Sequence, residues 1–147
     1  MIQADQSLED SIKDIKRFLL LNKMKLNDDK TEFLIIGTRQ QREKITKNKL
    51  KIGESEIKKA PDARNLGVFF DEDISMTRQV NEICKKGYYK LRSFAEIRPY
   101  LDEKTARTVA QALLTSTLDY GNSLFYGISK KNSNKLQALQ NATVRVV

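Results

Sequence analysis

The sequence predicts an α+β protein, in which an N-terminal helix with a small antiparallel sheet is followed by a three-helix bundle. Apolar residues recur at helical spacing near the N-terminus and again through the second half of the chain. Between these regions lie short apolar runs broken by glycine or proline, which are typical of strands and hairpins. Because the character of the sequence changes near Ser75, we expect two parts, residues 1–74 and 75–147.

The first part is predicted to contain one helix and several strands. The helix is expected from Leu8 to Lys23 or Met24, with "SLED" at residues 7–10 as a capping-box start. A buried strand is predicted for "TEFLIIG", a hairpin around Gly53 for "LKIGESEIKKA", and a strand ending at Asp71 for "RNLGVFFD". The polar stretch "TRQQREKITKNK", residues 38–49, is expected to be an exposed loop.

The second part is predicted to contain three helices. A long helix at residues 75–98 is expected to be capped by Ser75 or Asp73 and ended by Pro99. A second helix is expected from Asp102 to Leu118, and a third begins near Asn132. The third helix is still periodic at residue 147, so we expect an incomplete bundle, cut short at its C-terminus.

Composition narrows the classes of function. The 147 residues contain 27 Lys and Arg against 19 Asp and Glu, a formal charge of +8, which favours a polyanionic partner. Histidine is absent, which excludes Ser-His-Asp and Cys-His catalysis, and Cys84 is the single cysteine. We therefore expect no transition metal and an intracellular protein, nuclear or cytoplasmic. No apolar run approaches the roughly 20 residues that span a bilayer.

Two groups of acids are candidate metal ligands. Asp28 and Asp29 could bind a divalent cation, or could form the turn before the apolar run. Asp71 and Asp73 could do the same, or could cap the following helix. A metal-dependent nuclease using all four is one hypothesis, but the structural roles are favoured because such acids are common in turns and caps.

The long helix offers a candidate phosphate-binding surface. Four cations are predicted to lie on the flank left free by the apolar stripe: Lys85, Lys86, Lys90 and Arg92. The alternative is an ordinary solvated face. Among the neighbouring tyrosines, one ring is expected in the core, and Tyr89 is the better candidate to touch a sugar or base.

Several motifs, taken in order, carry a family resemblance: "KLNDDKTEFLIIGT", "ARNLGVFFDEDIS", "KLRSFAEIRPYL", "LLTSTLDYGNSLFYGIS" and "NKLQALQNATVRVV". In this order they resemble reverse transcriptases of LINE-type (non-LTR) retrotransposons, of the jockey and CR1 kind. The resemblance covers nearly the whole chain. It implies an RNA-directed DNA polymerase of which this chain is the end of the palm and most of the thumb.

The resemblance also implies what is missing. The aromatic-Ala-Asp-Asp hairpin that supplies the metal-binding aspartates of the family does not occur here. Mg²⁺ is expected for the full-length family enzyme, and neither a cofactor nor polymerase activity is expected for this chain alone. The implied partners are an RNA–DNA or DNA template–primer duplex and the remainder of the palm and fingers, with no membrane.

Residue roles follow from the same resemblance. Lys30 matches a lysine near the leaving pyrophosphate and would act as a general acid in the complete enzyme only; alternatively it is a surface residue at the start of a strand. Arg64 and Asn65 lie in a segment that resembles a primer grip. The four cations of the long helix and Tyr89 would contact the duplex in the manner of a thumb. A competing hypothesis is a vestigial or protein-interaction module derived from such an element, with no nucleic-acid activity.

Overall fold

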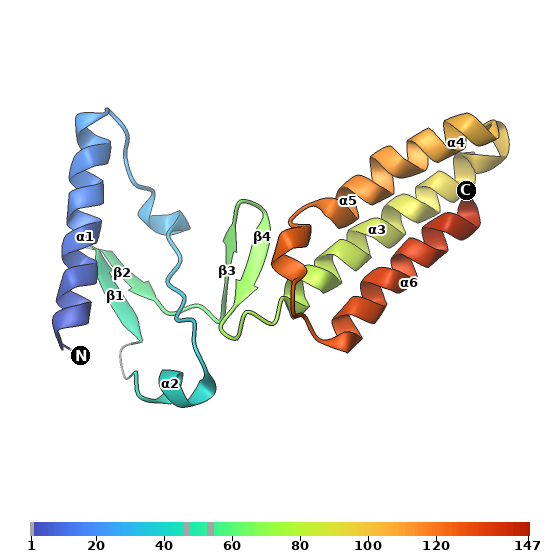
Figure 1. Ribbon diagram of the computed structural model, residues 1–147. Helices are drawn as coiled ribbons and strands as arrows, with labels where there is room; N and C mark the ends of the chain where they lie inside the picture. Colours follow the sequence, from blue (N-terminus) through green and yellow to red (C-terminus); the bar gives the residue numbers. More distant parts are fainter. Residues whose placement is uncertain (1, 46–47, 53–54) are drawn as a thin grey trace. The chain divides into compact units, whose positions relative to one another are not determined.

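The computed structural model describes residues 2–45, 48–52 and 55–147, and the chain divides into two compact units, Met1–Arg64 and Asn65–Val147 (Figure 1). The α+β class is confirmed: an N-terminal helix and two small antiparallel hairpins precede a mostly helical C-terminal part. The expectation that residues 1–74 act as the end of a palm and residues 75–147 as a thumb stays a prediction. None of the helices within the described ranges has the length and apolar character needed to cross a membrane.

The first unit is built from a long helix and one hairpin. Helix α1 (Ile2–Leu21) begins before the predicted capping box at Ser7. Strands β1 (Lys49–Ile52) and β2 (Ser55–Lys58) pair antiparallel, which confirms that hairpin, although its turn at Gly53 lies outside the described residues. The inward side chains of the hairpin form a small core, with partly buried apolar residues packed against it: Leu50, Ile52 and Ile57, with Ile12, Leu26 and Phe33.

The strand predicted for residues 31–37 is wrong. A short 3-10 helix, η1 (Asp28–Lys30), leads into this segment, and only Phe33 makes a bridge, a parallel one to Lys59. The carbonyl of Phe33 also accepts a 2.8 Å hydrogen bond from the N–H of Ala60. The apolar run thus lies against the chain that follows β2 at one point only, too little for a third strand.

The exposed loop predicted for residues 38–49 is also wrong in part, because it contains a short helix, α2 (Arg39–Glu43). Thr38 caps this helix through a capping box with Gln41, and Arg39 pairs with Glu43 at 2.9 Å. These local contacts order a segment whose composition alone indicates a loop. Residues 46 and 47 of the segment lie outside the described residues.

A second hairpin replaces the single strand predicted for residues 64–71. Strands β3 (Asp62–Asn65) and β4 (Val68–Asp71) form a two-stranded sheet. The two residues between them, Leu66 and Gly67, both have positive φ, 48° and 87°. Two successive positive φ angles characterise the tight hairpin turn that matches the twist of its strands.

The second unit contains the predicted helices. Helix α3 (Thr77–Ile97) begins after Met76, which makes no side-chain cap, so neither Ser75 nor Asp73 is the N-cap residue as predicted. The Ser75 hydroxyl nevertheless accepts a 3.3 Å hydrogen bond from the N–H of Thr77, the first residue of the helix. The chain then continues through a 3-10 turn, an interrupted helix, another 3-10 turn and a last helix: η2 (Arg98–Tyr100), α4 (Glu103–Ala110), η3 (Gln111–Thr115), α5 (Ser116–Asp119), η4 (Asn122–Phe125) and α6 (Lys130–Val146).

The predicted second helix is interrupted in its middle by η3, a turn of π-helix that joins α4 directly to α5. Its N-terminus lies where Asp102 predicts it, and Ser129 caps α6 by accepting a hydrogen bond from the N–H of Asn132. The core of the unit is formed by α3, α4 and η3, with residues of α6 packed against it: Leu91, Phe94, Ala106, Ala110 and Leu114, with Ala142 and Val146.

Helices α3 and α6 run parallel. Near their beginnings, the Asn132 amide donates to the Ser75 carbonyl and to Thr77 Oγ1, at 3.3 and 3.0 Å. Near their ends, Arg98 Nε donates to the Val147 carbonyl at 2.8 Å. This alignment places residues of α6 beside residues of α3 along the whole length of both helices (Figure 1).

Candidate nucleic-acid interface

The four predicted cations of α3 do not share one face. Successive helical residues are rotated by about 100°, so Lys85, Tyr89 and Arg92 lie together on the side opposite the buried residues. All three are exposed, and Lys86 is exposed farther round the helix. Lys90 is half-buried on the side toward α5. The structure therefore separates Lys86 and Lys90 from the other two cations.

Lys90 is engaged inside the second unit. Its ammonium group donates to the Leu113 carbonyl at 3.2 Å and to Thr117 Oγ1 at 2.7 Å. Leu113 lies in the π-helical turn η3, where the hydrogen-bond ladder of the helix is disturbed. Lys90 thus bridges α3 to the interrupted helix, which gives this cation a structural role.

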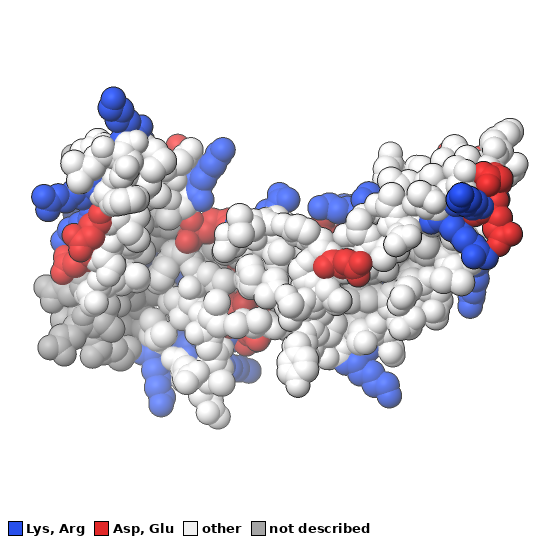
Figure 2. Space-filling view, turned by 45° about the horizontal axis from the view of Figure 1, so that its top comes forward, with Lys and Arg blue, Asp and Glu red and all other residues white. Residues whose placement is uncertain are grey.

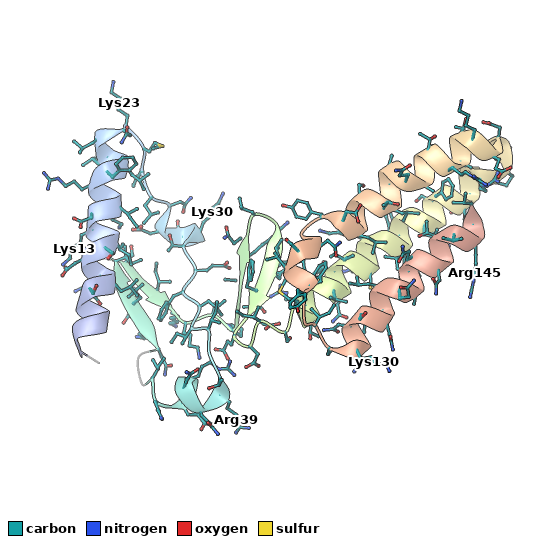
Figure 3. The ribbon with its side chains drawn as sticks, in the orientation of Figure 1. Lys13, Lys23, Lys30, Arg39, Lys130 and Arg145 are labelled. Carbon is teal, nitrogen blue, oxygen red and sulfur yellow. The ribbon has the colours of Figure 1, made fainter. Side chains whose placement is uncertain are left out.

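Helix α6 supplies cations that the sequence reasoning missed. The ammonium of Lys135 donates to Asn81 Oδ1 of α3 at 2.6 Å, so the two helices meet on this side. Lys131 lies one turn before Lys135, and Arg145 lies near the C-terminal end of α6 (Figure 3). We call the resulting surface the α3–α6 basic face; it consists of Lys85, Arg92, Lys131, Lys135 and Arg145.

Uncompensated charge distinguishes these two helices. Helix α6 has four cationic residues and no acid, and α3 has five cationic residues against Glu82 and Glu96. Four members of the basic face make no hydrogen bond or ion pair with any described residue: Lys85, Arg92, Lys131 and Arg145. The side of each unit that Figure 2 shows carries both signs of charge. The absence of acids after Asp119 was the sequence signal for this face.

Two tyrosines border the basic face. The prediction that one ring lies in the core is wrong, because Tyr88 is 45% exposed and Tyr89 is 75% exposed. The residue before them, Gly87, occupies the core position of this turn and is buried against Leu139 of α6. Both rings are therefore available to a ligand beside the cations.

Cys84 lies half-buried at the α3–α6 contact. Burial raises the pKa of its thiol, while the positive charge of Lys135 acts in the opposite direction. The raised pKa leaves the thiol protonated at neutral pH, so Cys84 lacks the thiolate character of a catalytic cysteine.

In the first unit, Lys30 ends the 3-10 helix η1 and is exposed (Figure 3). The neighbouring Asp28 is held in place: its carboxylate pairs with Lys16 at 3.1 Å and accepts a 2.9 Å bond from the Ser55 hydroxyl. The hydrogen bonds from Lys16 and Ser55 keep the pKa of Asp28 below its usual range. Asp28 thus attaches η1 to α1 and β2, and this attachment holds the backbone at Lys30, the last residue of η1, in place.

The remaining predicted residues lie at the second hairpin. Arg64 and Asn65 end β3 and both are exposed; the backbone N–H of Arg64 donates to Glu32 Oε2 at 2.8 Å. At the end of β4, the Asp71 carboxylate accepts bonds from the backbone N–H and the hydroxyl of Ser75, at 2.6 and 2.8 Å.

Within the described ranges, no three acidic or cysteine side chains are grouped so that they could hold a metal ion. Asp28 instead ties η1 to Lys16 of α1 and Ser55 of β2, and Asp71 bonds to Ser75 within its own loop, so both carboxylates have structural roles. The hypothesis of a nuclease that uses Asp28, Asp29, Asp71 and Asp73 has no support from these contacts.

Comparison of the chain with models of known families, with curated proteins and with solved structures gives no match. The resemblance to non-LTR retrotransposon reverse transcriptases thus stays a prediction from the sequence motifs.

Proposed function

We propose that this chain is the template–primer binding part of a reverse transcriptase of the non-LTR retrotransposon kind, without the catalytic aspartates. In this proposal the second unit acts as a thumb and grips the sugar–phosphate backbone of a duplex through the α3–α6 basic face. The observation that carries the proposal is that the parallel helices α3 and α6, joined by the Lys135–Asn81 contact, hold nine cationic residues against two acids, and that four cations of the basic face have no partner among the described residues.

The chemistry of this face favours a backbone-directed contact. Lysine and arginine side chains that neutralise phosphates release condensed counterions, and such contacts carry little sequence information. The exposed ring of Tyr89 adds a surface on which a sugar or base can rest. The expected binding is therefore independent of sequence and steeply dependent on salt.

The first unit would contribute the end of the palm. Lys30, exposed at the end of η1, would serve as the general acid when the rest of the polymerase and its Mg²⁺ are present. Arg64 and Asn65 would belong to the primer grip. Exposed apolar side chains on α1 support packing of this helix against the remainder of the palm and fingers: Leu8, Ile15, Phe18, Leu20 and Leu21.

The test compares two double variants with the same change in net charge. Lys85→Glu with Arg92→Glu alters the basic face, whereas Lys86→Glu with Lys104→Glu alters exposed residues elsewhere in the same unit. Binding of the whole chain to a labelled RNA–DNA hybrid is followed by fluorescence anisotropy over a series of salt concentrations. The first variant is expected to lose most affinity and to lower the slope of log K against log salt by about 1.8, because two phosphate contacts are lost at about 0.9 each.

The control variant should bind nearly as well as the wild type. Equal losses of affinity in both variants would show that only net charge matters and would contradict duplex binding through the basic face. No binding by the wild type at low salt would favour the competing hypothesis, a vestigial or protein-interaction module. Circular dichroism of each variant checks that the helices are intact.

A further inference from the structure

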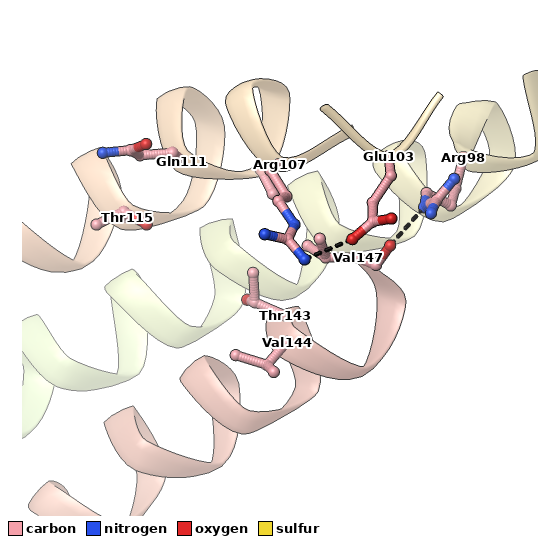
Figure 4. Close-up of a pocket in the computed structure, with 9 residues that line it drawn as sticks. Arg98, Glu103, Arg107, Gln111, Thr115, Thr143, Val144 and Val147 are labelled. Carbon is pink, nitrogen blue, oxygen red and sulfur yellow. Dashed lines mark hydrogen bonds and ion pairs between the residues drawn. The ribbon is translucent and has the colours of Figure 1, made fainter. Parts of the chain in front are cut away.

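A groove runs along the second unit between the interrupted helix α4–η3–α5 and helix α6. It consists of two cavities, of about 580 and 350 Å³. Thr115, Thr143 and Val144 line both cavities, so the two join into one groove. Figure 4 shows the larger cavity, with side chains of α4 and η3 on one wall and of α6 on the other. The volume of the larger cavity is in the range of sites that hold a ligand.

The π-helical turn lies on one wall of this groove. A π-helix places an extra residue in its turn, and such turns are frequently found at functional sites. Gln111 and Thr115 of η3 line the groove, while Leu114 is only 1% exposed. The walls thus combine an apolar surface with uncharged polar side chains.

The apolar part of the groove is only partly covered. Ala110, Leu118 and Leu136 contribute to its lining, and Val144 is 72% exposed. The uncharged polar groups along its sides are amides and hydroxyls, among them Gln111, Gln137, Gln140 and Ser133. A ligand that fits these walls carries an apolar stripe flanked by uncharged polar groups, which is the pattern of one face of an amphipathic helix.

The two ends of the groove carry opposite charge. Arg98 and Arg107 lie at one end with a single acid, Glu103, which pairs with Arg107 at 2.5 Å. Asp119 lies at the other end and has no hydrogen bond or ion pair with the described residues. Because a helix is positive at its N-terminus and negative at its C-terminus, this polarity selects one direction for a bound helix.

We propose that this groove is a docking site for an amphipathic α-helix of a partner polypeptide. The helix lies with its N-terminus at Asp119 and its C-terminus at Arg107, parallel to α6. From Glu103 to Asp119 the wall is about 24 Å long at 1.5 Å per residue, which fits a helix of about 16 residues. The site is separate from the α3–α6 basic face and does not depend on the function proposed above.

The test uses a synthetic helical peptide of about this length, with a leucine stripe, glutamine flanks and free termini. Saturable binding to the whole chain is expected by fluorescence anisotropy. Asp119→Lys is expected to weaken it by about fivefold to tenfold, because the positive end of the helix then meets a cation. A photo-crosslinker at the peptide N-terminus is expected to label the region of Asn122, and one at its C-terminus the region of Arg107.

Val144→Lys places a charge in the apolar part of the groove and is expected to abolish peptide binding. Val144 is exposed, so the fold should tolerate this change; Ala138→Lys, at an exposed position elsewhere on the same helix, is the matched control and should bind normally. Peptide binding unaffected by Val144→Lys, crosslinks in the reverse order, or no binding at all would overturn the proposal. Self-association of the chain that Val144→Lys abolishes would also overturn it, because the occupant would then be a second copy.

Discussion

A Cβ atom added to Gly87 of α3 would lie 2.3 Å from Cδ2 of Leu139 and 3.3 Å from its Cγ. Both residues are buried, and Leu139 is 0% exposed. Glycine at this position therefore allows α3 and α6 to approach closely enough to form one surface. The α3–α6 basic face depends on this approach, since its cations come from both helices.

Gly87→Ala is expected to destabilise the second unit. Forcing a methyl group into this packed contact costs about 1–3 kcal/mol, which is offset by up to about 1 kcal/mol from the better helix propensity of alanine. Urea denaturation measures the net loss. In a Leu139→Ala background the same substitution should cost much less, because its neighbour is gone. An equal cost in both backgrounds would contradict the role of this contact.

Lys90→Met is expected to lower stability while leaving nucleic-acid binding nearly intact. The variant keeps an aliphatic stem but removes the bonds to the Leu113 carbonyl and to Thr117, a loss of about 0.5–1.5 kcal/mol. Lys85→Met is the matched comparison: it should reduce duplex affinity and leave the unfolding free energy nearly unchanged. If Lys90→Met weakened binding more than Lys85→Met, Lys90 would belong to the interface.

Asp28 should make the first unit sensitive to acid. Its pKa is lowered in the folded state by Lys16 and then Ser55, so the unfolded chain binds the proton more readily. The stabilising contribution is present above the unfolded pKa and is lost as pH falls through the folded pKa. Thermal unfolding followed from about pH 7 down to about pH 3 should show this loss in the wild type.

The acid-dependent loss should be smaller in Asp28→Asn than in the wild type, and the part that remains includes Asp102, whose pKa is lowered by its hydrogen bond with Thr105. The exposed neighbour of Asp28 provides the control, since Asp29→Asn is expected to keep the pH dependence of the wild type. Identical profiles for the wild type and Asp28→Asn would show that the contacts with Lys16 and Ser55 contribute nothing.

Leu66→Asn is expected to raise the melting temperature of the protein. Leu66 has a φ of 48° in the turn of the second hairpin and is 84% exposed. Its left-handed backbone conformation therefore destabilises the fold, and its exposed side chain adds little packing to offset this. The destabilisation is roughly 1 kcal/mol, and asparagine is preferred at this position of the turn. The carbonyl of Leu66, which accepts a bond from the Tyr120 hydroxyl, is kept in the variant. Leu66→Ala should give no gain, since alanine has the same backbone restriction.

Local patterns predicted the long elements well. The apolar stripe of α3, the stop at Pro99 and the alternation in the first hairpin all lie in the sequence itself. Short elements were less predictable. The apolar run containing Phe33 has the composition of a strand, but a strand forms only where a partner offers hydrogen bonds along its length. Helix α2 depends on one capping box within a polar segment.

The sequence by itself determined the surplus of positive charge, the lack of histidine and the helical periodicity of the C-terminal half. Only the tertiary structure decided which cations act together. Lys90 turns toward the carbonyl of a π-helical turn, which no periodicity encodes, and Lys131 and Lys135 join Lys85 only because α6 packs parallel to α3. The physical reason is that a helical pattern gives the direction of each side chain about its own axis, whereas a shared surface also depends on where the next helix packs.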